Sequence, residues 1–253
     1  MHDAVPAGEP VRPGRDLRGQ DDHDRGEELV APRDRTVHDG ARRRRDDGVT
    51  LVELIVSMGI FTVLIAVVMG GVVMMTRSTV RADVTVTADD GLRTAFQRLD
   101  RQVRYAEAVN FPGNGAQGRR YVEFRVSAAV SATGRATCTQ WRWDPTAGTL
   151  DRRSWEDRAG VAVPAFATVV ADVQPPADGV TATYPFELLK ATSDNPRQRL
   201  VVRLRAGDPA VGNPVEQRTV FVARNSSTGS LTNSDTNAPG VSDIPVCMAG
   251  GRP

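Results

Sequence analysis

The chain has 253 residues, and its 32 basic and 31 acidic side chains leave a formal net charge of +1. Its three histidines all lie before residue 39, and it contains none of the usual patterns of hydrolase nucleophiles, zinc-binding cysteine pairs or phosphate-binding loops. A domain formed by the later residues therefore lacks the histidine needed for a Ser-His-Asp triad, for a catalytic Cys-His pair or for a histidine-ligated metal. Because no pair of carboxylates stands out either, we expect no enzymatic activity, no cofactor and no metal.

Residues 1–48 have the composition of a disordered segment. They contain 10 arginines and 12 acidic residues, with several glycines and prolines and no aromatic residue, so they cannot bury a core. Two explanations of this length stay open. Translation starts further along, for example at Val37, or the segment is a genuine disordered cytoplasmic leader.

The next segment, residues 49–75, is long and apolar enough to cross a membrane. Its only ionisable side chain is Glu53, and a helix of this length measures ~40 Å, against ~30 Å for the hydrocarbon core of a bilayer. Four arginines, residues 42–45, precede the segment, whereas Arg77 and Arg81 form a weaker cluster after it. The positive-inside rule therefore predicts a single span with the amino end in the cytoplasm and the later residues outside.

The start of this segment resembles the cleavage and methylation signal of type IV prepilins and pseudopilins. A basic run is followed by Gly48, the apolar residue Val49, the sequence Thr-Leu-Val-Glu ending at Glu53, and the apolar span. The resemblance covers residues 42–75. It departs at Val49, where phenylalanine is usual, and it lacks the proline often found midway along the helix, where the pair Gly70-Gly71 could supply the same local weakness.

The resemblance implies that a membrane aspartic peptidase cuts between Gly48 and Val49 and methylates the new amine of Val49. It also implies that Glu53, fifth in the mature chain, pairs with the amino terminus of a neighbouring subunit in a filament. The remaining 253 − 48 = 205 residues have room for one membrane helix and one modest domain. The alternative is an ordinary signal anchor with an isolated glutamate, which costs up to ~3 kcal/mol in lipid on insertion scales.

Residues 76–110 continue the helix in amphipathic form. Apolar side chains recur at steps of three or four, which predicts one buried stripe, and Asn110 and Pro112 mark the end. An apolar first half and an amphipathic second half resemble the pilin spine helix, and residues 92–109 are similar to the matching helix of W-type minor pilins and J-type pseudopilins. By itself, this half is better explained as the core helix of any extracellular domain.

Residues 111–253 predict a β-rich head outside the membrane. Trp141 and Trp143 share one face of an expected hairpin, and a packed sheet face explains them better than a ligand platform. The fold class that we expect is α+β and pilin-like, with the long helix packed on an antiparallel sheet and a loose tail from residue 225. The expected strands are residues 121–126, the hairpin strands 137–143 and 149–155, and residues 166–173, 180–187, 200–205 and 218–224.

The only two cysteines, Cys138 and Cys247, are both predicted to lie outside the membrane, where disulfides persist. We expect a bond that ties the tail to the sheet and contributes at most ~4.7 kcal/mol in the chain-entropy model. Two free thiols stay open as an alternative, because the sequence cannot place the Cβ atoms.

Two further clusters carry weaker predictions. Arg203 and Arg205 belong to a group of arginines on the last two strands, and such charge could bind DNA phosphates, although a solvated strand face explains it better. Asp235, Asn237 and Asp243 have oxygen ligands of the kind that calcium prefers, but they lack the spacing of a ligand loop.

The sequence therefore predicts a minor pilin or pseudopilin, a structural subunit of a type IV pilus or type II-like secretion filament. Its partners would be other pilin subunits, the prepilin peptidase, the inner-membrane assembly platform and membrane lipid, and it would pass from the cytoplasmic membrane into the filament. Two alternatives stay open. One is a bitopic membrane protein whose outer domain binds a ligand and never assembles, and the other is a DNA-binding subunit of a competence-type pilus.

Overall fold

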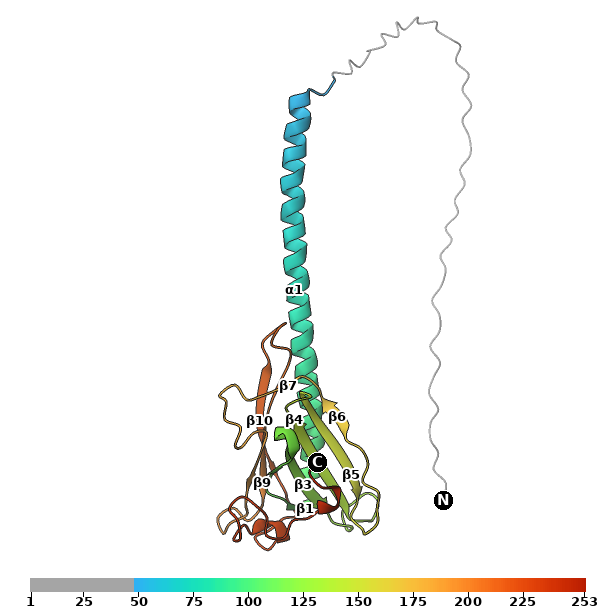
Figure 1. The fold of residues 1–253 in the computed structure, drawn as a ribbon, viewed down its shortest axis with the longest axis vertical. Helices are drawn as coiled ribbons and strands as arrows, with labels where there is room; N and C mark the ends of the chain where they lie inside the picture. Colours follow the sequence, from blue (N-terminus) through green and yellow to red (C-terminus); the bar gives the residue numbers. More distant parts are fainter. Residues whose placement is uncertain (1–47) are drawn as a thin grey trace, which may run out of the picture. The chain divides into compact units, whose positions relative to one another are not determined.

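The structure is a computed structural model that describes residues 48–253, so the leader predicted for residues 1–48 lies outside the described residues except for Gly48. One helix is followed by ten strands and three short 3₁₀ turns (Figure 1). In chain order the elements are α1 (Leu51–Arg104), β1 (Ala106–Val109), β2 (Gly113–Asn114), η1 (Ala116–Gly118), β3 (Arg120–Val126), β4 (Thr137–Asp144), β5 (Thr149–Glu156), β6 (Ala167–Val170), β7 (Val173–Gln174), β8 (Phe186–Leu189), β9 (Arg199–Ala206), β10 (Val215–Val222), η2 (Leu231–Asn233) and η3 (Met248–Gly250).

Helix α1 runs for 54 residues, ~80 Å at ~1.5 Å per residue. It continues unbroken through Gly70, Gly71 and Gly91, so the glycine pair does not interrupt the helix. The sequence predicted an end near Asn110, but α1 ends at Arg104. The reason is that the next residues pair with β3 and form β1 instead.

The strands form two antiparallel sheets, which confirms the α+β fold class. One sheet has the order β1-β3-β4-β5-β6, with β2 on β3, and the other has the order β10-β9-β7, with β8 also on β9. The expected hairpin is present as β4 and β5. The expectation of a single sheet is wrong. β9 and β10 pair with each other over their full length and belong to the second sheet, separate from the first.

Two expected strands are shorter than the sequence predicted. Residues 166–173 are divided between β6 and β7, because Asp172 has a φ of 54° and breaks the extended backbone. In the expected strand 180–187, β8 begins only after Pro185, a residue that has no backbone N–H to donate to a ladder.

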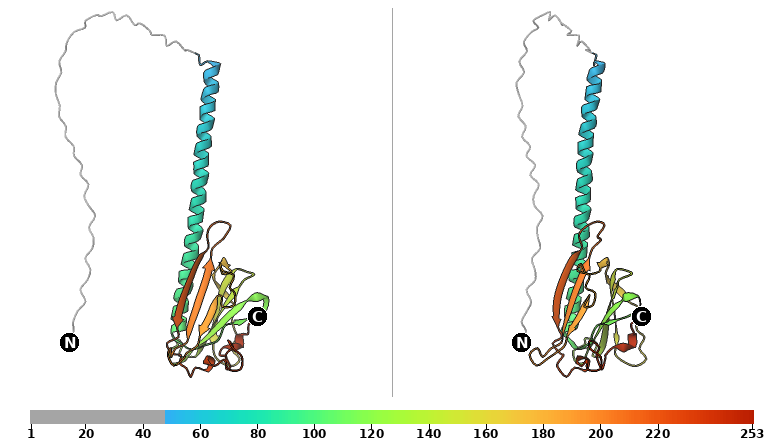
Figure 2. Two further views of the ribbon diagram at one scale, coloured as in Figure 1. Left: turned by 90° about the vertical axis from the view of Figure 1, so that its left-hand side faces the viewer. Right: turned by 60° about the vertical axis from the view of Figure 1, so that its left-hand side comes forward.

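The carboxyl-terminal half of α1 packs against both sheets (Figure 2). The indole nitrogen of Trp141 in the first sheet donates to Gln102 at 3.0 Å, and Phe96 stacks on Phe221 of the second sheet with ring centroids 5.8 Å apart. Trp141 and Trp143 are both buried in this core, as expected for a packed sheet face. The buried stripe of α1 consists of Leu92, Ala95, Phe96, Leu99 and Val103.

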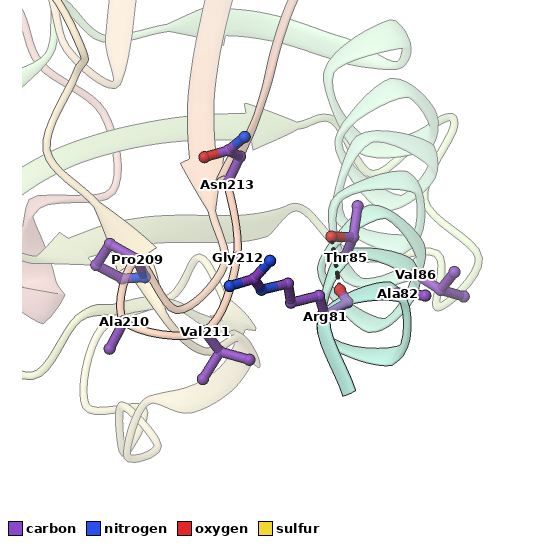
Figure 3. Close-up of a pocket in the computed structure, with 9 residues that line it drawn as sticks. All are labelled: Arg81, Ala82, Thr85, Val86, Pro209, Ala210, Val211, Gly212 and Asn213. Carbon is purple, nitrogen blue, oxygen red and sulfur yellow. Dashed lines mark hydrogen bonds between the residues drawn. The ribbon is translucent and has the colours of Figure 1, made fainter. Parts of the chain in front are cut away.

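The loop between β9 and β10, residues 207–214, also lies beside α1. It borders the helix from Thr76 to Val86, and Figure 3 shows its residues facing Arg81 and Thr85. In the views of Figure 2, this loop is the part of the head that extends furthest along α1 toward the helix amino end.

The segment after residue 225 is packed and not loose, which corrects the sequence prediction. Ser226 and Thr232 are fully buried, and the amide of Gln198 donates to Thr232 Oγ1 at 3.1 Å. Further along, Asn110 donates to the carbonyl of Val246 at 2.7 Å. Polar side chains next to the strands thus hold the tail in place through hydrogen bonds to its side chains and backbone. The pattern of apolar residues in the sequence does not predict such contacts.

The turn between β4 and β5 is organised by Asp144. Its carboxylate accepts from Thr146 N at 3.0 Å, from Ala147 N at 3.1 Å and from Arg119 Nε at 2.6 Å. Burial alone would raise the pKa of Asp144, but the hydrogen bond from Arg119 and the two backbone N–H groups hold that pKa below its ordinary value.

Because the folded state lowers this pKa, Asp144 stabilises the fold above its ordinary pKa of 3.8, and the stabilisation is lost as the pH falls through the folded pKa. We expect Asp144→Asn to lower the free energy of unfolding at neutral pH by ~1.5–3 kcal/mol, the range for hydrogen bonds to charged groups. The difference in the free energy of unfolding between wild type and Asp144→Asn should become smaller below about pH 3. Urea unfolding at both pH values checks this, with the substitution Asp90→Asn at an exposed position of α1 as control. Equal stability of wild type and Asp144→Asn at neutral pH would contradict it.

Candidate functional site: the amino-terminal segment of α1

The segment before α1 is accessible and unconstrained. Gly48, Val49 and Thr50 are non-helical and exposed. A Cβ at Gly48 would meet no heavy atom of the described residues within 4 Å, and Gly48 does not have a positive φ. Packing among the described residues therefore does not require glycine at this position, and its small size is available to a partner that needs an unhindered chain.

Thr50 marks the start of the helix. Its hydroxyl accepts a hydrogen bond from the backbone N–H of Glu53 at 3.3 Å, which is the N-cap contact of a Thr-x-x-Glu capping box. Glu53 lies in the first turn, where the helix dipole favours a negative charge. The sequence Thr-Leu-Val-Glu thus has a local structural role, in addition to any role that it has with a partner.

Within the described residues 48–253, no part of the protein covers the amino-terminal half of α1. By length and composition, α1 is long and apolar enough to cross a membrane, and its most apolar stretch is entirely unburied in the structure of residues 48–253. The hydroxyls of Thr62 and Thr76 are satisfied within the helix, since they donate to carbonyls four residues earlier at 2.8 and 2.9 Å. Such internal pairing is what a lipid environment requires.

Glu53 is the exception in this apolar half, because it is the only ionisable side chain between Val49 and Met75. It lies four residues after Val49, or ~6 Å along a helix axis. Gly48, Val49 and Glu53 therefore all lie at the exposed beginning of the helix. Their roles in cleavage and assembly stay predictions.

Comparison with known protein families finds a match at this same segment of the chain. Residues 43–75 match the family model described as the prokaryotic N-terminal methylation motif. The chain carries a type IV prepilin-like amino terminus. The motif implies processing by a peptidase and assembly with other pilins, and together with the apolar helix it indicates membrane anchoring. No curated protein and no solved structure matches the chain.

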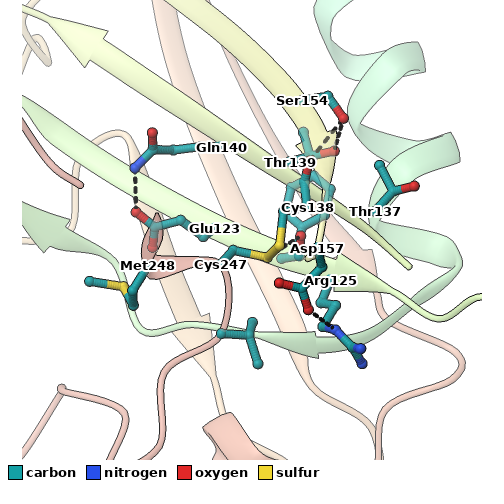
Figure 4. The surroundings of a disulfide bond; sticks show 12 residues. Glu123, Arg125, Thr137, Cys138, Thr139, Gln140, Ser154, Asp157, Cys247 and Met248 are labelled. Carbon is teal, nitrogen blue, oxygen red and sulfur yellow. Dashed lines mark hydrogen bonds and ion pairs between the residues drawn. A yellow bond between two sulfur atoms is a disulfide. The ribbon is translucent and has the colours of Figure 1, made fainter. Parts of the chain in front are cut away.

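In the β-rich part of the chain, Cys138 of β4 and Cys247 of the tail are joined by a disulfide (Figure 4). Their Cα atoms are 5.4 Å apart, and 109 residues separate them in the sequence. The bond lies in a small apolar cluster with Ala108, Trp155 and Val246. It fixes the tail against β4.

We expect the double substitution Cys138→Ala and Cys247→Ala to lower the free energy of unfolding by up to ~4.7 kcal/mol, because the disulfide restricts a loop of about 100 residues in the unfolded chain. Urea unfolding of the full chain in detergent measures the change. Wild type treated with a reductant is the control, and it should unfold at a similarly lowered midpoint. An unchanged midpoint in both samples would contradict this expectation.

The structure also shows a buried polar cluster that the sequence did not predict. Glu123 is fully buried; its carboxylate accepts from Gln140 at 2.8 Å, from Arg252 at 2.6 Å and from Asn110 at 3.1 Å. Figure 4 shows Gln140 directed toward Glu123. The only sign of this cluster in the sequence was Glu123, an acidic residue in a strand where apolar residues occupy alternate positions. Such alternation predicts a side chain on the solvent face.

The two clusters with weaker predictions, the arginines of the last two strands and the calcium-type group in the tail, do not form binding sites among the described residues. Arg203 forms ion pairs with Glu216 and Asp178, and the hydrogen bonds that its guanidinium donates to these carboxylates raise its pKa. Arg205 donates to the carbonyl of Pro175 at 3.3 Å. This pairing weakens the case for phosphate binding. Within residues 48–253, no group of His, Cys, Asp or Glu is placed to hold a metal.

The carboxylates of the calcium-type cluster are engaged within the tail itself. Asp243 accepts from the backbone N–H groups of Thr236 at 3.0 Å and Asn237 at 2.9 Å. Asp235 accepts from Lys190 at 2.6 Å. These residues organise the loop, which accounts for their presence without a metal.

Proposed function

We propose that this chain is a minor pilin or pseudopilin, a structural subunit of a type IV pilus or of a type II-like secretion filament. The observation that carries the proposal is the match of residues 43–75 to the N-terminal methylation motif. The matched segment includes the apolar half of α1, whose side chains are not buried by any other part of residues 48–253. In this role the chain performs no reaction of its own. It is the substrate of the prepilin peptidase, which cuts between Gly48 and Val49 and so removes residues 1–48.

The proposed topology is a single pass with residues 49–75 in the membrane, the amino end in the cytoplasm and the head, residues 111–253, outside. The exposed apolar side chains of this half support it, since Leu51, Phe61 and Met74 are each more than half exposed, at 74, 62 and 76%. Such a surface must be covered by lipid or by other apolar helices. Lipid covers it in the membrane-bound subunit, and neighbouring subunits cover it in a filament.

Within this family we propose a W-type minor pilin or a J-type pseudopilin. The support is the similarity of residues 92–109, together with the packing of this part of α1 against both sheets of the head. Residues 76–104 then form the amphipathic half of the spine, and the assembly platform of the inner membrane and other pilin subunits are the partners.

Shearing of cells and fractionation test assembly. We expect the mature chain in the sheared filament fraction, together with a membrane pool. A cut chain that stays entirely in the membrane fraction, while other pilins are sheared off normally, would favour the bitopic membrane protein and contradict the proposal.

A further inference from the structure

The loop between β9 and β10 lies where the apolar span ends. Two neighbouring cavities separate the loop from α1, with volumes of about 800 and 350 Å³. Arg81 lines both cavities, and Arg77 lines the smaller one. Figure 3 shows the side chain of Arg81 directed from α1 toward the loop.

The position of these arginines can be compared with the layers of a bilayer. The uninterrupted apolar run ends at Met75, so Arg77 and Arg81 follow it by ~3 and ~9 Å along the axis at ~1.5 Å per residue. The headgroup layer on each side of the ~30 Å hydrocarbon core is ~5–8 Å thick. If the span crosses the membrane as proposed, both guanidinium groups can therefore reach the level of the lipid phosphates, since long arginine stems adapt their depth.

The composition of the loop, residues 207–214, is compatible with a position in the lipid headgroup layer. Asp208 is its only ionisable residue, and its carboxylate accepts from the backbone N–H of Ala210 at 2.8 Å. The tip therefore presents Ala210, an exposed residue, and the partly exposed Val211. No acidic side chain lines either cavity.

The charges around the cavities favour an anion. Neither Arg77 nor Arg81 forms an ion pair with any residue in the described range 48–253. The apolar side chains of Val80 and Val211 line the smaller cavity beside them. Two cationic groups next to an open apolar surface complement a phospholipid, whose phosphate would face the arginines while the first carbons of its acyl chains face the apolar side chains.

We propose that the 207–214 loop rests in the headgroup layer of the outer leaflet, and that Arg77 and Arg81 hold an anionic phospholipid between this loop and α1. The proposal rests on the membrane topology of the proposed function. It gives the membrane-bound subunit a second lipid contact besides its span, which would fix the rotation of the head relative to the membrane surface before assembly.

Spin labels on the full chain in vesicles of phosphatidylcholine and phosphatidylglycerol test the depth of the loop. Labels are placed by the substitutions Ala210→Cys in the loop, Ile65→Cys in the span, and Asp194→Cys in the connection at the opposite end of β9. Collision with oxygen reports lipid, and collision with a water-soluble nickel chelate reports water. We expect Ile65 in lipid, Asp194 in water and Ala210 at an intermediate depth.

The labels separate failure of this inference from failure of the proposed function. If Ile65 lies in lipid but Ala210 is as accessible to nickel as Asp194, the loop does not rest on the membrane and the inference is wrong, while the topology stands. If Ile65 is also in water, the proposed topology fails and the inference fails with it.

Lipid selectivity tests the arginines. Each of Arg77 and Arg81 should raise the preference of the chain for phosphatidylglycerol over phosphatidylcholine about fivefold. Spin-labelled lipids around the wild-type chain measure this preference. Arg77→Gln with Arg81→Gln should remove this preference. The matched control is Arg98→Gln with Arg101→Gln, the same charge change on exposed positions that lie ~26 Å or more beyond Arg81 along α1. Loss of the preference in the control pair, or its removal by inorganic phosphate in solution, would overturn the assignment to a lipid.

Discussion

Replacing Gly48 with valine is expected to leave the precursor uncut in the membrane. The chain must thread the peptidase in an extended form, and a β-branched side chain next to the cut bond obstructs that passage. The structure indicates that the substitution leaves the fold of residues 48–253 intact, because a Cβ at Gly48 meets no heavy atom of these described residues within 4 Å and the position has no positive φ. Immunoblotting of membranes for precursor and mature forms measures the effect.

Gly59→Val is the matched control for this experiment. Gly59 also has no heavy atom within 4 Å of an added Cβ, and it lies 11 residues beyond Gly48, so the variant should be cut normally. If the Gly48→Val chain matures like wild type, the assigned cleavage site is wrong.

Replacing Glu53 with glutamine is expected to leave synthesis, insertion and cleavage largely intact and to reduce incorporation into filaments by at least ~10-fold. In the membrane-bound subunit, the carboxylate lies close enough to the interface to reach water. In a filament it would be surrounded by apolar helices, where an unpaired charge is very unfavourable and a charge paired with the amine of a neighbouring Val49 is acceptable. That pairing would also set the axial stagger between subunits, because any other register leaves both charges buried alone.

The capping geometry makes this substitution selective. Glutamine occupies the same position of a capping box as glutamate, and the observed N-cap contact uses the backbone N–H of Glu53 and the hydroxyl of Thr50, so the helix start is preserved. Crosslinking to neighbouring pilins should fall while the membrane pool stays unchanged. Glu53→Asp keeps the charge and should restore part of the incorporation. Assembly of the glutamine variant at the wild-type level would show that Glu53 does not set the register.

The sequence predicted those parts of the fold that depend on neighbouring residues. The apolar and amphipathic halves of α1 and the β4–β5 hairpin follow from periodicity and from the turn at Asp144, which are local. The end of α1 and the division into two sheets were missed, because they depend on which distant strands pair. Nothing near residue 106 indicates that it will pair with Val126.

The buried polar contacts of the head were missed for a related reason. Glu123 alternates with Val122 and Phe124, so the pattern placed it in solvent, but the tail brings Arg252 over it from 129 residues away. The ion pairs of Arg203 could not be predicted for the same reason, since its partner Asp178 comes from a different segment. DNA binding at this group of arginines stays a weak prediction. By contrast, Gly48 and Glu53 are specified by spacing alone, and the motif match includes both.

The mass and amino-terminal sequence of the chain purified from membranes test the central claim most directly. The account predicts a chain of residues 49–253 that begins at Val49 and carries one methyl group on its amine. A chain that retains residues 1–48, or that begins at a residue other than Val49, would contradict it.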